Sequence, residues 1–243
     1  MNFKSPILCC IALASHATAA VLVDINADGT NRNATLANFE DAAGVSSGTF
    51  GGSSITYFPN SDPGGGAYSQ TVDNITISID DITNDADGWF GTGSNNNLLE
   101  DGLYHRDTTG DPTATVTLSG SGLGLLANTT YELYLFAGRS QGHLTSFTFD
   151  VINPADPTGG STIAAGIPVV GGNETLGTVM YTFTTGGVAP TQLVFDWDGQ
   201  QHVNGNQDAV FSGFALNTIP EPSSALLSMI GLAGLITLRH RNS

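Results

Sequence analysis

Residues 131–137 read YELYLFA, and this stretch indicates the fold class of the chain. Apolar side chains occupy both alternating sets of positions, as in a strand covered on both faces at the centre of a sandwich. Other segments alternate apolar with polar residues, as at Ile75, Ile77 and Ile79, which is the pattern of half-buried strands. About eight segments fit a strand in these ways: 21–26, 75–79, 114–118, 131–137, 147–151, 179–183, 193–197 and 211–215.

Turn-forming residues separate these segments, as in DPGGG at 62–66 and NPADP at 153–157. Helical periodicity is weak along the whole domain. Two antiparallel sheets packed face to face bury alternating apolar rows of this kind. The sequence therefore predicts one all-β domain over residues 21–218, an antiparallel two-sheet sandwich of jelly-roll type. We expect an N-terminal signal helix and a C-terminal hydrophobic helix to flank it.

Residues 1–20 have the order of a secretory signal peptide. Lys4 is followed by an apolar run over 7–13 and by small residues over 17–20. The apolar run is far shorter than the roughly 20 residues of a membrane span. Cys9 and Cys10 both lie in the segment that we expect to be removed, which excludes disulfides, thiolate metal sites and cysteine nucleophiles from the exported chain.

Residues 219–243 contain an apolar segment, 223–238, that carries no charge. As a helix it would reach about 24 Å, somewhat less than the roughly 30 Å hydrocarbon core, and snorkelling arginines would extend its reach. We expect the basic end in the cytoplasm and the domain outside. The flanking residues are Pro220, Glu221 and Pro222 before the segment and Arg239 and Arg241 after it.

This combination at the C-terminus resembles the PEP-CTERM sorting signal, although the basic group is smaller than in many members. The resemblance implies recognition by an exosortase, a membrane transpeptidase that cuts such tails and transfers the protein toward the cell surface, usually in bacteria with a polysaccharide matrix. The stretches 128–140 and 211–216 are similar to PEP-CTERM proteins with a galactose-binding-like sandwich. Sugar binding does not follow from that likeness of fold.

The stretch between the two terminal signals is strongly acidic. Residues 21–222 hold all 22 acidic residues against Arg32, Arg106 and Arg139, a formal charge of 3 − 22 = −19. Such a field repels nucleic acid and anionic lipid. It suits a protein outside the cell, or one that binds cations.

A nucleophile-elbow pattern, G-x-S-x-G, occurs at 138–142, with Asp196 and His202 following in hydrolase order. The motif needs a helix directly after its serine. Here the residues from 145 to 151 read as another strand, so a glycine-rich hairpin explains the pattern better than catalysis does.

Half of a calcium-loop pattern, D-x-N-x-D-G, begins at Asp24 and continues through Asn26 and Asp28. The twelfth position is Thr35, where the complete loop would supply a bidentate glutamate. Looser groups of oxygen-bearing residues include Asp85 with Asp87, and Asp198 with Asp208. Solvated turns explain any one group equally, and calcium is the one cofactor that the sequence suggests.

Aromatic and charged residues in loop-like stretches are the candidate ligand-binding residues. Rings on exposed loops can stack on sugars, while arginine and aspartate bind hydroxyl groups. Rings that cap the core explain the same residues equally well, and the histidines are not spaced as a metal triad. The candidates are Trp89, Tyr104, His105, Arg106 and Arg139.

Two functional classes follow. In the first, an exported, tail-sorted surface or matrix protein uses its sandwich as a non-catalytic carbohydrate-binding or adhesive module. Its partners would be an exosortase, extracellular polysaccharide and, before processing, the membrane. In the second, the domain is a structural matrix component without a small ligand. A serine hydrolase is a distant third.

Overall fold

The computed structural model describes residues 19–26, 33–59, 66–82, 84–85, 97–99, 102–107, 113–139, 144–150, 163–167, 175–200 and 207–219. Some strand residues, such as 104–107, 138–139, 144–150, 198–200 and 207–209, are described by their backbone alone. Ala19–Ile219 form one compact unit. The predicted signal helix and hydrophobic tail helix lie outside the described residues.

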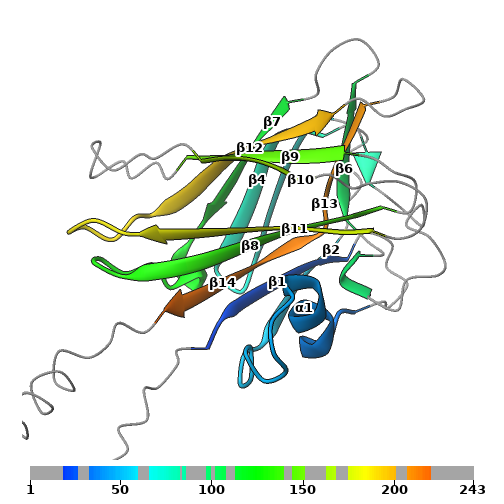
Figure 1. Ribbon diagram of the computed structural model, residues 1–243. Helices are drawn as coiled ribbons and strands as arrows, with labels where there is room; N and C mark the ends of the chain where they lie inside the picture. Colours follow the sequence, from blue (N-terminus) through cyan, green and yellow to red (C-terminus); the bar gives the residue numbers. More distant parts are fainter. Residues whose placement is uncertain are drawn as a thin grey trace, which may run out of the picture. The chain divides into compact units, whose positions relative to one another are not determined.

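Two large sheets build the fold (Figure 1). The five-stranded sheet has the order β11-β8-β14-β1-β2, and the six-stranded sheet the order β10-β9-β12-β7-β4-β3. Neighbouring strands are antiparallel except for β1 and β2, which are parallel. The five-stranded sheet comprises β1 (Val21–Asn26), β2 (Ile55–Pro59), β8 (Thr130–Arg139), β11 (Thr175–Thr184) and β14 (Gly213–Ile219). The six-stranded sheet comprises β3 (Gly66–Val72), β4 (Ile75–Ile82), β7 (Thr113–Ser119), β9 (Leu144–Asp150), β10 (Ile163–Ile167) and β12 (Gln192–Gln200).

The strand order is that of a jelly roll. Numbered one to eight along the chain, the strands β1, β7 to β12 and β14 take the order 1-8-3-6 in one sheet and 2-7-4-5 in the other. This is the connectivity of two Greek keys wrapped into a double sheet. β2, β3 and β4 extend the sheets beyond this set. The predicted sandwich is therefore confirmed by the topology of the chain itself.

The main core lies between the sheets and follows from the alternation in each strand. In β4, the residues Ile75, Ile77 and Ile79 are buried while their neighbours are not. Tyr131 of β8 stacks on Phe183 of β11, with ring centroids 5.4 Å apart. Because side chains alternate along a strand, each strand turns one row of apolar side chains to the core. A shift by one residue would expose that row, so the buried rows set the register of both sheets.

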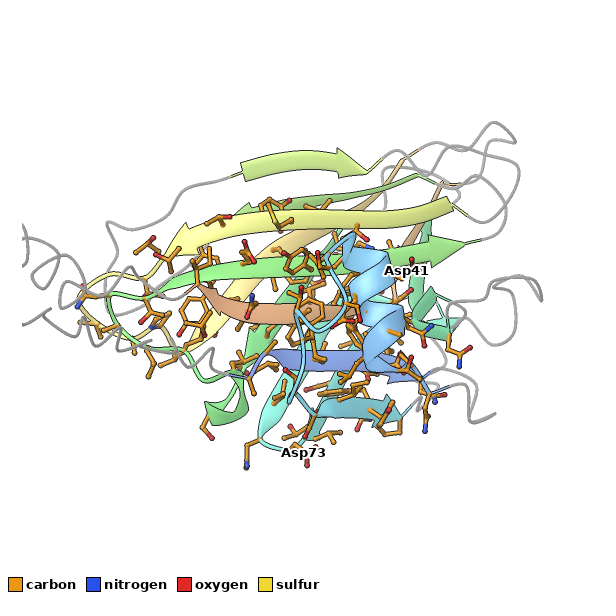
Figure 2. The ribbon with its side chains drawn as sticks, turned by 60° about the horizontal axis from the view of Figure 1, so that its bottom comes forward. Asp41 and Asp73 are labelled. Carbon is orange, nitrogen blue, oxygen red and sulfur yellow. The ribbon has the colours of Figure 1, made fainter. Side chains whose placement is uncertain are left out.

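A second, smaller core covers the outer face of the five-stranded sheet. It forms beneath helix α1 (Leu36–Ala43), which Figure 2 shows lying across the strands and on which Asp41 is labelled. Phe39 of α1 meets Phe136 of β8 edge to face at 5.6 Å. β8 therefore buries Tyr134 and Phe136 on this face and Leu133 and Leu135 on the other, as its sequence predicts.

A third sheet of three strands, in the order β13-β6-β5, lies at one end of the sandwich, to the right in Figure 1. β13 contacts β8 of one large sheet and β9 and β12 of the other. Phe211 of β13 packs on Phe195 and Trp197 of β12. The strands are β5 (Asn84–Asp85), β6 (Leu103–Asp107) and β13 (Gln207–Phe211), and two short 3₁₀ helices complete the described elements, η1 (Asn97–Leu99) and η2 (Ser121–Leu123).

Several elements differ from the sequence-based expectation. The stretch at Tyr104 to Arg106 was expected to be a loop and is the strand β6, paired on both sides. The predicted strand at 211–215 is divided between β13 and β14, which meet at Ser212. Helix α1 and the strands β2, β3, β5 and β10 were not predicted.

Candidate functional site

Two side chains on one face of β1 each carry a buried oxygen atom without a hydrogen-bond partner among the described residues. Asp24 is completely buried, and its Oδ1 accepts no hydrogen bond from the described residues. The buried Oδ1 of Asn26 accepts none either. Because side chains two residues apart in a strand point to the same side, both belong to the outer face, on which Leu22 packs. We call this pair the β1 oxygen site.

The segment before α1 forms one wall of the β1 oxygen site. The N–H of Ala34 donates to Asp24 Oδ2 at 2.9 Å, and Asn26 Nδ2 donates to Asn33 Oδ1 at 2.7 Å. Thr35 starts α1 as its N-cap, with its side chain and that of Asn38 forming a capping box. The segment before α1 is thus held against β1 by the hydrogen bonds to Asp24 and from Asn26.

The other walls come from β2 and η1. Asp24 pairs in register with Tyr57 of β2, and the Tyr57 hydroxyl donates to the carbonyl of Ala34 at 3.0 Å. Asn97 of η1 donates through Nδ2 to the carbonyl of Asn33 at 3.2 Å. On the β14 side, Asp24 pairs with Gly213. The segment before α1, which donates to Asp24, is therefore also held by β2 and by η1.

Burial controls the protonation of this carboxylate. Desolvation raises the pKa of Asp24 to about 7, and the Ala34 N–H lowers it by a smaller amount. Burial, and next the charge on Asp24, also raise the pKa of Tyr57. An ionised carboxylate with one oxygen unpaired is costly in such surroundings. The site favours either a proton or a bound cation.

The chemistry of the β1 oxygen site suits a hard cation. Calcium takes six to eight oxygen ligands at about 2.3–2.6 Å, from carboxylates, amides, backbone carbonyls and water. Among the described residues, no three His, Cys, Asp or Glu side chains are grouped closely enough to hold a metal ion. A cation at the site would therefore use amide and carbonyl oxygens besides Asp24. Thr35, the twelfth position of the predicted calcium loop, is engaged in the α1 capping box, and Asp28 lies outside the described residues.

The three-stranded sheet brings part of the predicted ligand set together. Antiparallel register partners lie on the same face of a sheet. Tyr104 is opposite Asn84 on one side and Val210 on the other, and Arg106 is opposite Asp208. Tyr104 and Arg106 therefore share one face with Asn84, Asp208 and Val210, of which Val210 is buried. We call the four polar positions, Asn84, Tyr104, Arg106 and Asp208, the β6 face.

The other candidate ligand residues do not lie on the β6 face. His105 alternates with Tyr104 and shares its side of β6 with Leu103, which is buried in the main core. Arg139 is at the end of β8, in register with Thr175. Trp89 lies outside the described residues.

The nucleophile-elbow pattern lacks its supporting structure where the chain is described. Gly138 and Arg139 end β8, and the next described element is the strand β9, as the sequence predicts. Asp196 is exposed on β12. Ser140 and His202 lie outside the described residues.

The sorting residues also lie outside the described residues: Pro220, Glu221, Pro222, Arg239 and Arg241. In the part of the chain that the structure describes, no helix is both long and apolar enough to cross a membrane.

Sequence reasoning missed three residues around the β1 oxygen site: Asn33, Tyr57 and Asn97. Asn97 and Asn33 are 64 residues apart, so no local spacing could have connected them. Asn33 was detectable in principle, because it stands two residues before the Thr35 capping signal.

No protein-family model and no curated protein matches the sequence. Among solved structures, the chain is similar to the enzymatically active domain of bacteriophage CBA120 tailspike protein 4, with 13% identity and a TM-score of 0.33 over 65% of this chain and 20% of that chain. TmCBM61 in complex with β-1,4-galactotriose matches with 7% identity and a TM-score of 0.34, over 65% of this chain and 90% of that chain. The CBM22-1 xylan-binding domain of Xyn10C from Paenibacillus barcinonensis matches with 8% identity and a TM-score of 0.31, over 64% of this chain and 87% of that chain. At such values these likenesses assign no family, ligand or activity, and the sandwich is assigned from its own strand order.

Proposed function

We propose that this chain is an exported, non-catalytic polysaccharide-binding protein that is sorted to the cell surface through its C-terminal tail. The order of features in residues 1–20 and 219–243 supports export and sorting. The observation that carries the binding role is the β6 face, where register places Tyr104 and Arg106 together with Asn84 and Asp208.

These four residue types fit the chemistry of a sugar. A tyrosine ring offers an apolar face to the C–H side of a pyranose and a hydroxyl for hydrogen bonding. Arginine donates in a planar fork, aspartate accepts, and asparagine does both. Polysaccharide hydroxyls supply the matching donors and acceptors. Tyr104 and Arg106 also belong to the strand β6 rather than to a loop, which keeps the spacing between them fixed.

A glycan array with residues 19–219 tests this role, followed by affinity electrophoresis in gels that contain each polysaccharide that binds. We expect Tyr104→Ala and Arg106→Ala each to weaken retention by at least roughly tenfold, a loss of about 1.4 kcal/mol. Thr182→Ala, at an exposed position on β11, is the matched control and should bind normally. Absence of binding to every polysaccharide would leave the structural matrix role as the better account.

We also propose that Asp24 and Asn26 bind a calcium ion. The support is a fully buried carboxylate with one unpaired oxygen and, on the same strand face, a second buried oxygen in the same condition. The bound ion would supply the positive charge that these oxygens lack, and would fix the segment before α1 against β1. Its function in this proposal is structural, since no described residue near it has the arrangement of a nucleophile and base.

Titration calorimetry of the chelator-treated protein with calcium chloride tests this site. We expect binding in the wild type, no measurable heat with Asp24→Asn, and weaker binding with Asn26→Ala. Asp81→Asn, at an exposed position on β4, should behave as the wild type. Unchanged calcium binding in Asp24→Asn would show that the ion binds at another site.

A further inference from the structure

Two loops lie beside the point at which the chain leaves the sandwich. Ile219, the last residue of β14, pairs with Thr130, the first residue of β8, and Thr130 also pairs with Thr184, the last residue of β11. Residues 120–129 lead directly into Thr130, and residues 185–191 directly follow Thr184. We call these the tail-side loops. They lie at the left in Figure 1.

Hydrogen bonds join the tail-side loops into one surface. The N–H of Thr185 donates to the carbonyl of Thr129 at 2.9 Å, and its hydroxyl donates to the carbonyl of Leu126 at 2.6 Å. The N–H of Asn128 donates to the carbonyl of Gly186 at 2.9 Å. The two segments therefore present their side chains together on a fixed framework.

The surface is uncharged and carries exposed apolar side chains. Neither loop contains an acidic or basic residue, although residues 21–222 hold 22 acidic residues. Leu126 is 57% exposed and Val188 is 48% exposed. Acidic residues adjoin the loops: Asp73, in the β3–β4 turn that touches Gly122 and is labelled in Figure 2, Glu132 of β8, and Glu221, which follows Ile219 in the sequence. The loops themselves, however, are uncharged in a strongly acidic protein.

The short connection between the sandwich and the apolar segment of the tail limits how far the tail-side loops can lie from a membrane. Only Pro220, Glu221 and Pro222 separate Ile219 from the apolar segment 223–238. Four residue steps reach at most about 14 Å, and the headgroup layer of one leaflet is itself roughly 5–7 Å deep. If the segment is inserted, Ile219 lies within about 14 Å of the hydrocarbon core, which brings the loops beside it near the headgroups.

We propose that the tail-side loops dock on the phospholipid headgroups while the tail is inserted, with Leu126 and Val188 entering the interface. The inference rests on the membrane insertion of the tail contained in the proposed function. Exposed apolar side chains gain by leaving water for the interface. The lack of acidic residues in the loops avoids repulsion from an anionic leaflet, which the rest of the domain would experience.

Fluorescence quenching of the exported chain, residues 21–243, in vesicles tests the docking. This chain has no native cysteine, so one introduced thiol takes a polarity-sensitive fluorophore, and the protein is reconstituted into phosphatidylcholine vesicles with nitroxide-labelled headgroups. The label is placed by Leu126→Cys, by Val188→Cys or, as the control, by Asp81→Cys. Position 81 is exposed and lies six residues along β4 from Ile75, which is beside Gly120 and Gly122 of the tail-side loops. It therefore stands about 20 Å farther from the loops than Ile75 does.

We expect at least twofold stronger quenching at positions 126 and 188 than at position 81. Flotation of the same vesicles in a density gradient reports separately on tail insertion. Protein that floats but is quenched equally at all three positions overturns the docking and leaves tail insertion standing. Protein that fails to float overturns both.

Discussion

Burial of the Asp24 carboxylate makes the stability of the domain depend on pH and, in the proposed function, on a calcium ion. Its unfolded-state pKa is the ordinary value of 3.8, and burial raises the folded-state pKa to about 7. Between these two pH values the folded state keeps a proton that the unfolded state has released. Stability therefore decreases as pH rises from about 4 to about 7, by at most about 4 kcal/mol.

Calcium should reverse this dependence, because it binds the ionised carboxylate and competes with the proton. In chelator, we expect the melting temperature to fall between about pH 4 and about pH 7 and to level off above that. Excess calcium should raise it most at the upper end of this range, and magnesium should raise it less, since magnesium gives up its water reluctantly. Matched sodium chloride controls for screening.

The variant Asp24→Asn isolates this residue from the other acidic groups. It should show a smaller pH dependence in chelator and no calcium increment, whereas exposed Asp81→Asn should keep both. Identical pH profiles for Asp24→Asn and the wild type would show that Asp24 does not govern the transition.

Glu40 is a buried carboxylate with a purely structural use. Its Oε1 accepts from the N–H groups of Gly48 and Phe50, at 2.8 and 3.0 Å, which holds the loop after α1 against the sheet. Glu40→Ala leaves both donors without this acceptor and should lower the free energy of unfolding by about 2–4 kcal/mol. Glu40→Gln keeps one oxygen and should lose less.

Urea denaturation measures this effect. The neighbouring Asp41 is exposed, so Asp41→Ala should change the free energy of unfolding by no more than about 0.5 kcal/mol. Equal stabilities of the Glu40 and Asp41 variants would contradict the role assigned to Glu40.

Among the elements, the β3–β4 hairpin depends on a glycine from another part of the chain. Asp73 and Asn74 take positive φ angles of 49° and 61°, as in a type I′ turn that follows the twist of its strands. Gly120 packs against this turn, and a Cβ there would meet the Asn74 carbonyl oxygen. Its own φ is 103°, which a side chain rarely adopts.

Gly120→Ala should therefore cost roughly 2–4 kcal/mol of unfolding free energy. Gly187 is the matched control, because it has an ordinary φ and open space around its Cα, so Gly187→Ala should be neutral or slightly stabilising. Thermal melts of the two variants measure the effect. A melting temperature of Gly120→Ala equal to that of the wild type would show that the β3–β4 turn can shift to make room for the added methyl group.

The large strands could be predicted from sequence because each carries its own evidence. Alternation marks β4 and β7, and the doubly apolar stretch marks β8. Helix α1 was missed because it has only eight residues, LANFEDAA, of which Phe39, Glu40 and Ala42 are buried, too few turns to show a period. β5 and β6 are defined by pairing with distant strands, so their local sequence resembles loops. In the candidate site, Asp24 and Asn26 could be singled out from sequence because their spacing is local, whereas Asn97 joins it only through the fold.

At the scale of the whole molecule, the two proposals assign different functions to the two ends of the sandwich. β14 begins at Gly213, beside the three-stranded sheet, and ends at Ile219, beside the tail-side loops. Seven residues of strand separate these ends by about 20 Å. In the proposed arrangement the tail-side loops face the bilayer, which leaves the β6 face at the end that points away from it. A ligand surface at that end would be accessible to matrix polysaccharide.

This arrangement depends on sorting, and the tail offers a direct test. Replacing Pro220, Glu221 and Pro222 with alanine leaves the signal peptide and the apolar segment 223–238 intact, so export and membrane retention should continue. Processing should stop, because the altered residues are those that an exosortase is expected to recognise. Immunoblots of cell fractions should then show the full-length chain accumulating in the membrane and little at the surface. Ser223→Ala with Ser224→Ala, just beyond the motif, is the control and should be processed normally. If the chain altered at 220–222 is still trimmed and delivered like the wild type, the tail is not a sorting signal of this kind.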